Sequence, residues 1–258
     1  MPKDVPKPLK SDEAAAVLFA TCVEAVQNGS LIDRVSQTDK EFSFQNWMGT
    51  MLVESGMLFD EPSRNAYPDF RLINLPVGFE VKGLGYPGRE ANYDCNSQIP
   101  SGMHNGREIY YVFGRYPTKP DGSSYPILDM VICHGDFLNS DHGYIHENKN
   151  IKGFGSYGDI MIRDRKMYVA PTPFALLKGA AHNFTLITAN KVDCPGLHLK
   201  GTLLRQEADQ VIESYSFNLT TNKLVPTMSK NPRADRQREF YAYGIGKQAL
   251  PVSMAKCK

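Results

Sequence analysis

Two acidic residues and a lysine in one short stretch of this sequence could together hold a metal ion and hydrolyse a phosphodiester bond. Asp69 is followed by ten intervening residues and then Glu80, and Lys82 stands two positions later. Because side chains alternate along a β-strand, Glu80 and Lys82 point to one face of a strand and the apolar residues beside them to the other. If the segments around Asp69 and Glu80 pair as a hairpin, two carboxylates and an ammonium converge on one face.

This combination suits metal-dependent phosphodiester hydrolysis. Carboxylate oxygens are the ligands that Mg²⁺ takes, and the ion keeps its remaining positions for water and phosphate oxygens. A bound metal polarises the phosphate and acidifies a water, while a lysine positions or deprotonates that water and stabilises the transition state. The pattern therefore predicts Asp69 and Glu80 as metal ligands and Lys82 as a catalytic residue, with Mg²⁺ as the cofactor and Mn²⁺ able to substitute.

The same residues resemble the active-site pattern of the PD-(D/E)xK nuclease superfamily, here as Pro68-Asp69 followed by Glu80-Val81-Lys82. The resemblance implies that a helix before the hairpin adds a further acidic residue. On the helix expected over residues 40–54, Glu41 is in line with the core-facing apolar stripe and is the first candidate for this role. Glu54 is the competing candidate.

The wider chain is similar to type II restriction endonucleases, loosely to those of the NgoPII type, which cut GGCC-containing DNA. The similarity lies in the segments 80–90, 107–116 and 154–160 and in a length suited to a homodimer subunit. It implies a homodimer that cuts both strands of double-stranded DNA at a short palindromic site. Two alternatives stay open: a structure-selective or repair nuclease of the same superfamily, and a DNA-binding module with an inactive site.

A polar segment directly after the active-site strand is expected to contact the DNA. Its side chains carry the paired donors and acceptors that read base edges or hold phosphates, and Arg89 or Arg107 would be the guanine readers of a G/C-rich site. Taken singly, each of these residues could instead serve only to form a loop, since Asn, Ser and Gly favour turns. The predicted DNA-binding residues are Arg89, Asn92, Asn96, Ser97, Gln98, His104, Asn105 and Arg107.

Two other segments offer rival sites. His142 and His146 are four residues apart, as metal ligands on a helix would be, but Gly143 weakens the helix and no second cluster follows. Residues 159–166 repeat an acid-x-Lys pattern, with Asp164 before Lys166. That segment is too short to pair two strands around an active site, and it is interpreted as a hairpin turn.

The order of elements predicts an α/β (α+β) domain, a mixed central sheet flanked by helices. Helical spacing of apolar residues favours helices over 11–27 and 40–54 and a further helix over 203–214, and β-rich runs lie between. One endonuclease domain over residues 1–258 is expected, with an N-terminal helical region (1–40), a catalytic core with DNA-reading loops (41–175) and a C-terminal region with a basic tail (176–258).

Composition is that of a soluble globular protein, with 41% hydrophobic and 22% charged residues. Five widely spaced cysteines without a C-x-x-C pair argue against a disulfide framework. No signal peptide or membrane span is expected, so the interpretation is a cytoplasmic, prokaryotic protein without a membrane partner. Residues 221–258 carry eight Lys/Arg against two Asp/Glu, in a chain of net charge +1, which fits an arm that contacts phosphates.

Overall fold

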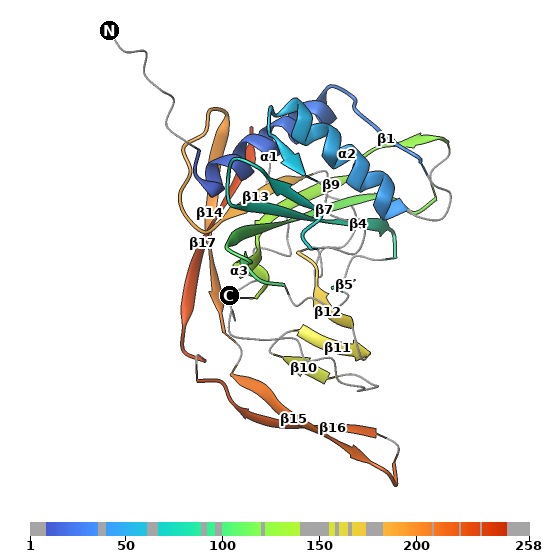
Figure 1. Ribbon diagram of the computed structural model, residues 1–258, viewed down its shortest axis with the longest axis vertical. Helices are drawn as coiled ribbons and strands as arrows, with labels where there is room; N and C mark the ends of the chain where they lie inside the picture. The colour runs from blue at the N-terminus through green and yellow to red at the C-terminus, as the bar shows by residue number, and fades with distance from the viewer. Residues whose placement is uncertain are drawn as a thin grey trace.

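A mixed sheet forms the centre of the computed structural model (Figure 1). Nine strands make up this sheet, in which β4 and β7 are parallel, as are β9 and β13, and the remaining pairs are antiparallel. The strands lie in the order β14 (Leu197–Gln206), β17 (Gln237–Ile245), β13 (Phe184–Thr188), β9 (Asp129–His134), β7 (Arg107–Pro117), β4 (Val77–Tyr86), β3 (Phe70–Leu72) and β2 (Phe59–Asp60), and β6 (Met103–His104) pairs with β7.

The description covers most of the chain. It takes in residues 9–35, 40–60, 67–88, 92–95, 100–119, 122–139, 155–157, 160–164, 167–173, 183–207, 209–221, 223–232 and 234–246. Within these ranges, the fold class expected from the sequence is confirmed.

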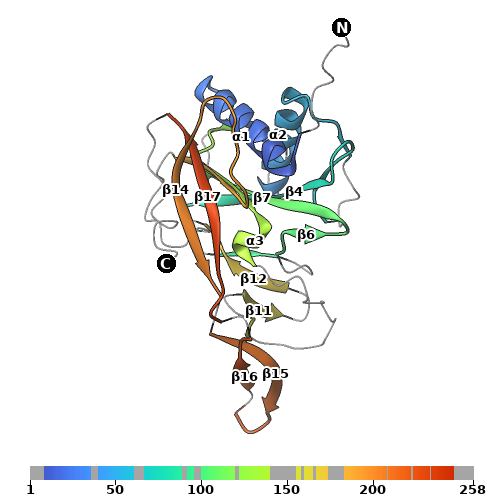
Figure 2. The ribbon, with the colours of Figure 1, turned by 90° about the vertical axis from the view of Figure 1, so that its left-hand side faces the viewer.

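Helices cover one face of the central sheet. The helices α1 (Ser11–Gln27) and α2 (Lys40–Glu54) lie above β4 and β7 in both views (Figures 1 and 2), while the short helix α3 (Gly135–Leu138) lies on the other side. Both long helices fall where apolar spacing placed them. Gly56, after α2, has a φ of 72°, a conformation that glycine adopts at no steric cost at a helix end.

Strand alternation divides the core into two layers. Phe79 and Val81 of β4 pack in the cluster that includes the two long helices. Tyr111 and Phe113 of β7 belong to a second cluster on the opposite face, with Tyr93 of β5 (Asn92–Asp94). Glu80 and Lys82 are therefore on the face turned away from the two long helices.

Three smaller sheets accompany the central one. A four-stranded sheet has the order β10 (Gly155–Tyr157), β11 (Ile160–Asp164), β12 (Met167–Pro171) and β5, and β1 (Ile32–Asp33) pairs with β8 (Ser124–Tyr125). The third is the hairpin of β15 (Gln210–Asn218) and β16 (Lys223–Lys230), which projects at the far end of the molecule (Figures 1 and 2).

The helix predicted over residues 203–214 is wrong. This stretch forms the end of β14 and the start of β15. Leu203 is buried and its neighbour Leu204 is 43% exposed, so the true period is two, and pairing with β17 decides the conformation. By contrast, the hairpin interpretation of residues 159–166 is confirmed, since β11 and β12 pair antiparallel.

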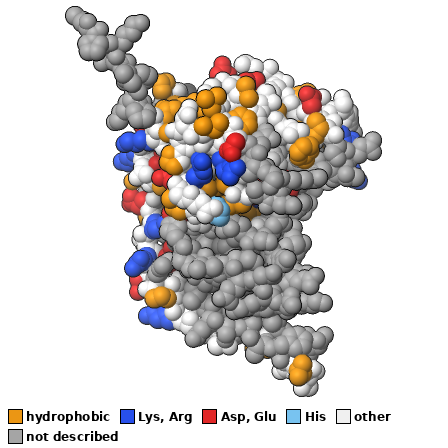
Figure 3. All heavy atoms as spheres, in the orientation of Figure 1, with side chains coloured by type: hydrophobic (Ala, Val, Ile, Leu, Met, Phe, Trp, Pro, Cys, Tyr) orange, Lys and Arg blue, Asp and Glu red, His pale blue; other side chains and the backbone are white. Residues whose placement is uncertain are grey.

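On the face shown in Figure 3, exposed hydrophobic side chains gather at the top of the molecule, over the two long helices. Leu31, Phe42 and Val53 are among the exposed large hydrophobic residues of this part. None of the described helices has the length and apolar character that a membrane span requires.

Candidate active site

The β3–β4 hairpin brings the two predicted carboxylates together. Phe70 pairs with Phe79 and Arg71 with Gly78, so Asp69, one residue before β3, lies opposite Glu80. The pairing expected from the sequence is thereby confirmed. The two side chains are on the sheet face that is turned away from α1 and α2.

A hydrogen bond fixes the position of Asp69. Its Oδ2 accepts from the backbone N–H of Val81 at 2.7 Å. The pairing between β3 and β4 ends at Phe79. The Val81 N–H therefore has no described partner on β3, and the Asp69 carboxylate accepts from it instead. Oδ1 is left to serve another partner, which is what a metal ligand needs.

Close packing between Pro68 and Gly78 sets the approach of Asp69 to β4. A Cβ on Gly78 would lie 2.4 Å from Pro68 Cγ and 3.1 Å from Ile109 Cδ1. A proline ring has little freedom to move aside, so only glycine allows this contact. The proline that precedes the aspartate thus has a structural reason to be there.

This contact gives a first prediction. Gly78→Ala should push Pro68, and with it Asp69, away from β4, lowering stability by about 1 to 3 kcal/mol through overpacking and cleavage by about 10²-fold through a misplaced ligand. Gly122→Ala is the matched control, because its Cβ would meet no described atom closer than 3.8 Å. Thermal melting and a cleavage time course measure both effects; wild-type cleavage by Gly78→Ala would contradict the account.

Glu80 and Lys82 form a buried ion pair. Lys82 Nζ lies 2.7 Å from Glu80 Oε1, and both side chains are 11% exposed. The other carboxylate oxygen, Glu80 Oε2, is buried and has no hydrogen-bond partner among the described residues. A buried carboxylate oxygen in this state is costly unless a ligand satisfies it.

Glu41 joins this group from the first turn of α2. Its Oε1 lies 3.7 Å from Lys82 Nζ, with the Glu41 side chain 45% exposed. The helix can come this close because the residue after Lys82 on β4 is a glycine. A Cβ on Gly83 would lie 3.2 Å from Glu41 Cα. Glu54 stands at the other end of α2, roughly 20 Å away along the helix axis, where its charge acts on Cys22.

A second prediction concerns which of these two acids, Glu41 or Glu54, belongs to the site. Glu41→Gln should slow DNA cleavage by roughly 10- to 100-fold, the usual effect of losing a group that supports a metal site. Glu54→Gln, the same substitution on the same helix, should leave cleavage unchanged. Single-turnover rates of the two variants decide; equal rates, or a larger loss for Glu54→Gln, would remove Glu41 from the site.

The electrostatics of the cluster are those of converging like charges. Burial, with the neighbouring Glu80 charge, raises the pKa of Asp69 to about 7, against the opposing effects of Lys82 and the Val81 N–H. Burial alone would lower the pKa of Lys82, but Glu80, Glu41 and Asp69 outweigh it and raise that pKa above its usual range. Lys82 is therefore a cation at neutral pH.

Comparisons with protein families, curated proteins and solved structures find no match.

Two tyrosines that sequence reasoning missed, Tyr67 and Tyr111, lie close enough to Glu80 for its charge to act on them. The hydroxyl groups of Tyr67 and Tyr111 are hydrogen-bonded at 2.8 Å, and the ring of His104 packs edge-on against Tyr67 with centroids 4.8 Å apart. Burial and the nearby Glu80 charge raise the pKa of Tyr67 well above its usual value. In the sequence, only the position of Tyr67 directly before Pro68-Asp69 indicates that this tyrosine belongs to the site.

The structure describes four of the predicted DNA-binding residues, which are Asn92, His104, Asn105 and Arg107. Asn92 is exposed on β5. Asn105 and Gly106 form the two-residue turn between β6 and β7, with φ of 47° and 73°, which suits an Asn-Gly hairpin. Arg107 Nη1 donates to the carbonyls of Leu72 and Leu75 at 2.8 and 3.1 Å.

Other candidate residues lie outside the described part of the chain. Whether they contact DNA or metal stays a prediction. They are Arg89, Asn96, Ser97 and Gln98 of the predicted DNA-binding segment, and His142, His146 and Lys166 of the rival sites.

Asp69 and Glu80 fit Mg²⁺ better than a metal that needs a full set of protein ligands. Among the described residues, no group of three or more His, Cys, Asp or Glu side chains is placed to hold a metal ion. Mg²⁺ does not require one, because it is usually bound through one or two carboxylates together with waters and substrate phosphate. The unpartnered Glu80 Oε2 and the Asp69 carboxylate opposite it supply such a donor pair.

Proposed function

We propose that this chain is a Mg²⁺-dependent endonuclease of double-stranded DNA, with Asp69, Glu80 and Lys82 as its active centre. The observation that carries the proposal is the position of Asp69 opposite Glu80, one residue beyond the Phe70–Phe79 pair of the β3–β4 hairpin, with the Lys82 ammonium 2.7 Å from Glu80. Lys82 balances the charge of one of the two carboxylates, and a bound divalent cation would balance the repulsion that remains between Asp69 and Glu80.

Glu80 can serve the metal and the lysine together. Its Oε1 is held by Lys82, while Oε2 has no described partner and is the oxygen to bind the metal. Asp69 supplies the second carboxylate, oriented by the Val81 N–H. When bound, Mg²⁺ would polarise the scissile phosphate and acidify a water.

The part of Lys82 is electrostatic. The neighbouring carboxylates raise the pKa of Lys82 and keep its side chain a cation at neutral pH in the metal-free protein. A fixed cation at this place stabilises the negative charge that grows on the phosphoryl oxygens in the transition state. Lys82 also holds the Glu80 carboxylate in its orientation.

Within this proposal, a type II restriction enzyme is the form we favour. The resemblance of the segments 80–90, 107–116 and 154–160 to enzymes of the NgoPII type supports it. A homodimer that cuts both strands of a palindrome follows from symmetry, because two-fold DNA symmetry calls for two-fold protein symmetry. Light scattering of the protein on a duplex oligonucleotide tests the dimer.

Incubation with plasmid DNA and Mg²⁺, followed by mapping of the ends, tests the function. Discrete bands with one common end sequence are expected. Cutting that depends on flaps or junctions would instead favour a structure-selective or repair nuclease. Tight DNA binding without cleavage under Mg²⁺ or Mn²⁺ would leave an inactive binding module and contradict the proposal.

A further inference from the structure

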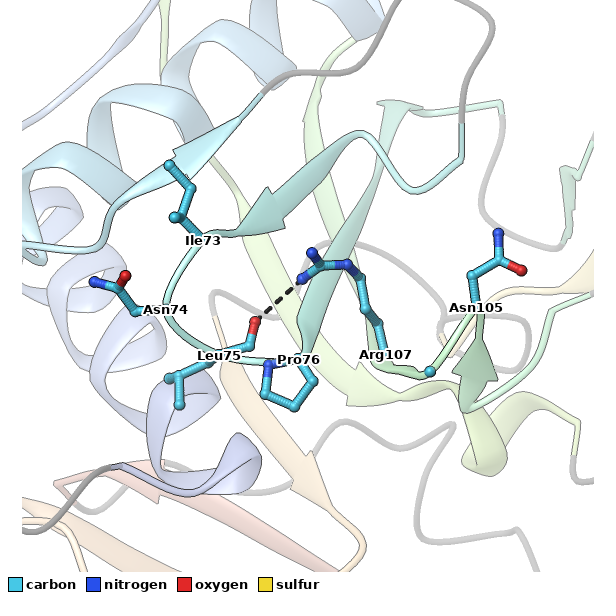
Figure 4. Close-up of a pocket in the computed structure, with 7 residues that line it drawn as sticks. Ile73, Asn74, Leu75, Pro76, Asn105 and Arg107 are labelled. Atoms are coloured by element: carbon cyan, nitrogen blue, oxygen red, sulfur yellow. Dashed lines mark hydrogen bonds between the residues drawn. The ribbon is translucent and has the colours of Figure 1, made fainter.

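A shallow, open pocket lies between two neighbouring turns where the active-site strand β4 begins. Its volume is about 340 Å³. One wall is the turn between β3 and β4 and the other is the turn between β6 and β7 (Figure 4). We call it the turn pocket; its lining residues are Ile73, Asn74, Leu75, Pro76, Asn105, Gly106 and Arg107.

Arg107 is held rigidly in this pocket. Its Nη1 donates to two backbone carbonyls of the opposite wall, those of Leu72 and Leu75, and Figure 4 shows the guanidinium directed across the pocket toward Leu75. A guanidinium has five N–H donors in a fixed fork. None of the described residues accepts from Nε or Nη2, so three donors and the positive charge remain for a ligand.

The turn pocket and the active centre share one face of the sheet. Arg107 stands four residues before Tyr111 on β7, and Tyr111 is in register with Glu80, so strand alternation turns both Arg107 and Glu80 to the same side. Pro76 and Glu80 are four residues apart on one chain, roughly 13 Å at about 3.3 Å per residue.

Contacts connect the two places. His104 is paired with Arg107 across the β6–β7 hairpin, and its ring packs on Tyr67, two residues before Asp69. Asn105 Nδ2 lies 3.0 Å from His104 Nε2, which ties the pocket rim to that ring. A DNA strand that lies over Glu80 and His104 would therefore also reach Arg107.

We infer that the turn pocket binds a backbone phosphate of the DNA, a few nucleotides from the one that is cut. This rests on the proposed function and deepens it. The spacing fits, since roughly 13 Å corresponds to a few nucleotides at about 3.4 Å of axial rise each. The donors fit as well: the Arg107 guanidinium in the pocket lining (Figure 4) offers positive charge and N–H groups, the chemistry of phosphate contacts.

The pocket suits a phosphate better than a base. Reading guanine requires an arginine that reaches into a groove and meets two acceptors side by side. Arg107 instead uses Nη1 to donate to the carbonyls of Leu72 and Leu75 and stays between two turns. The Glu108 side chain, the nearest acid in sequence, is turned to the opposite face by alternation and adds its charge to the environment of Tyr110 and His134.

Fluorescence anisotropy of the full chain on a labelled duplex, with Ca²⁺ in place of Mg²⁺ and over a range of salt, tests this inference. Arg107→Gln should raise Kd by about 10-fold or more and lower the salt slope of log K by about 1, as loss of one phosphate contact does. Asn74→Asp leaves Arg107 and its carbonyl bonds in place, yet adds a negative charge to the pocket lining, and should also weaken binding several-fold.

Lys10→Gln is the control, since it removes a charge at the start of α1, on the other side of the sheet, and should leave both quantities unchanged. If Arg107→Gln weakens binding with an unaltered salt slope and Asn74→Asp binds like wild type, Arg107 only supports the turn and the inference falls. A wild-type protein that cuts DNA while both variants bind normally overturns the pocket alone. A wild-type protein that neither binds nor cuts DNA overturns the proposed function itself.

Discussion

Lys82→Ala is expected to bind DNA but to cut it at least about 10²-fold more slowly, the size of one lost electrostatic or acid–base contribution. The reason lies in the position of the ammonium, 2.7 Å from Glu80 and 3.7 Å from Glu41. Its removal takes away the cation that, in the proposed mechanism, would face the reacting phosphate, and it frees the Glu80 carboxylate from its partner. Single-turnover cleavage at saturating protein isolates the rate of the chemical step.

Two further variants make this result interpretable. Lys10→Ala removes an exposed lysine on the other side of the sheet and should cut at the wild-type rate. Lys82→Arg keeps the charge but replaces a compact ammonium by a planar fork, so it should recover part of the rate lost in Lys82→Ala. Near-wild-type cutting by Lys82→Ala would remove this residue from the active centre.

Local sequence signals were sufficient to predict the hairpin that carries the site. The Asn, Pro and Gly residues within 74–78 and the alternation in Phe79-Glu80-Val81-Lys82 are properties of a few neighbouring residues. They correctly predicted that Asp69 would meet Glu80. The two long helices were predictable for the same reason, since their apolar stripes repeat over many residues.

Features that depend on distant partners were not predictable in this way. Residues 203–214 contain Leu203 and Leu204 at a spacing that also suits a helix, and only the ladder with β17 makes them strand. Likewise, Tyr111 and Tyr67 are far apart in the sequence. Only the parallel pairing of β4 with β7 in the folded chain brings their two hydroxyl groups together. Contacts of this kind belong to the tertiary fold.

Arg107 illustrates the same limit at the level of one side chain. Sequence placed it among the residues that could read guanine. Its Nη1 bonds to the carbonyls of Leu72 and Leu75 depend on how two separate turns meet, which no local pattern encodes. Those bonds change the part that we assign to it, from reading a base to holding a phosphate.

A second large effect is expected in the metal-free protein, where Asp69→Asn should raise stability while it abolishes Mg²⁺-dependent cleavage. The pKa of Asp69 is raised from 3.8 to about 7 by burial and by Glu80. Asn removes the charge and keeps an oxygen that can accept from the Val81 N–H. At pH 8 without metal, the gain should be about 1 to 3 kcal/mol, or several degrees in Tm.

The sign of the pH dependence follows from the same shift. Below pH 3.8 the carboxyl is neutral in the folded and unfolded chain, and its burial then carries no charge penalty. Between 3.8 and about 7 the folded protein binds more protons than the unfolded chain, so this group lowers stability as pH rises. Above about pH 7 the whole penalty is present. Asp69→Asn should remove this part of the decline, so the two stability curves should diverge as pH rises toward 7.

Mg²⁺ should reduce the difference in stability between the two proteins, because it should stabilise the wild type and not Asp69→Asn. A ligand that binds only the folded state stabilises it by RT ln(1 + [L]/Kd), so Mg²⁺ should raise the Tm of the wild type at pH 8 and leave that of Asp69→Asn unchanged. Asp60→Asn is the matched control: Asp60 pairs with Arg71 at 2.7 Å on the surface, and its loss should cost no more than about 1 kcal/mol and leave the Mg²⁺ response intact. An Asp69→Asn protein that is less stable than wild type without metal, or that still responds to Mg²⁺, would show that the Asp69 carboxylate is a structural group and that the metal binds elsewhere.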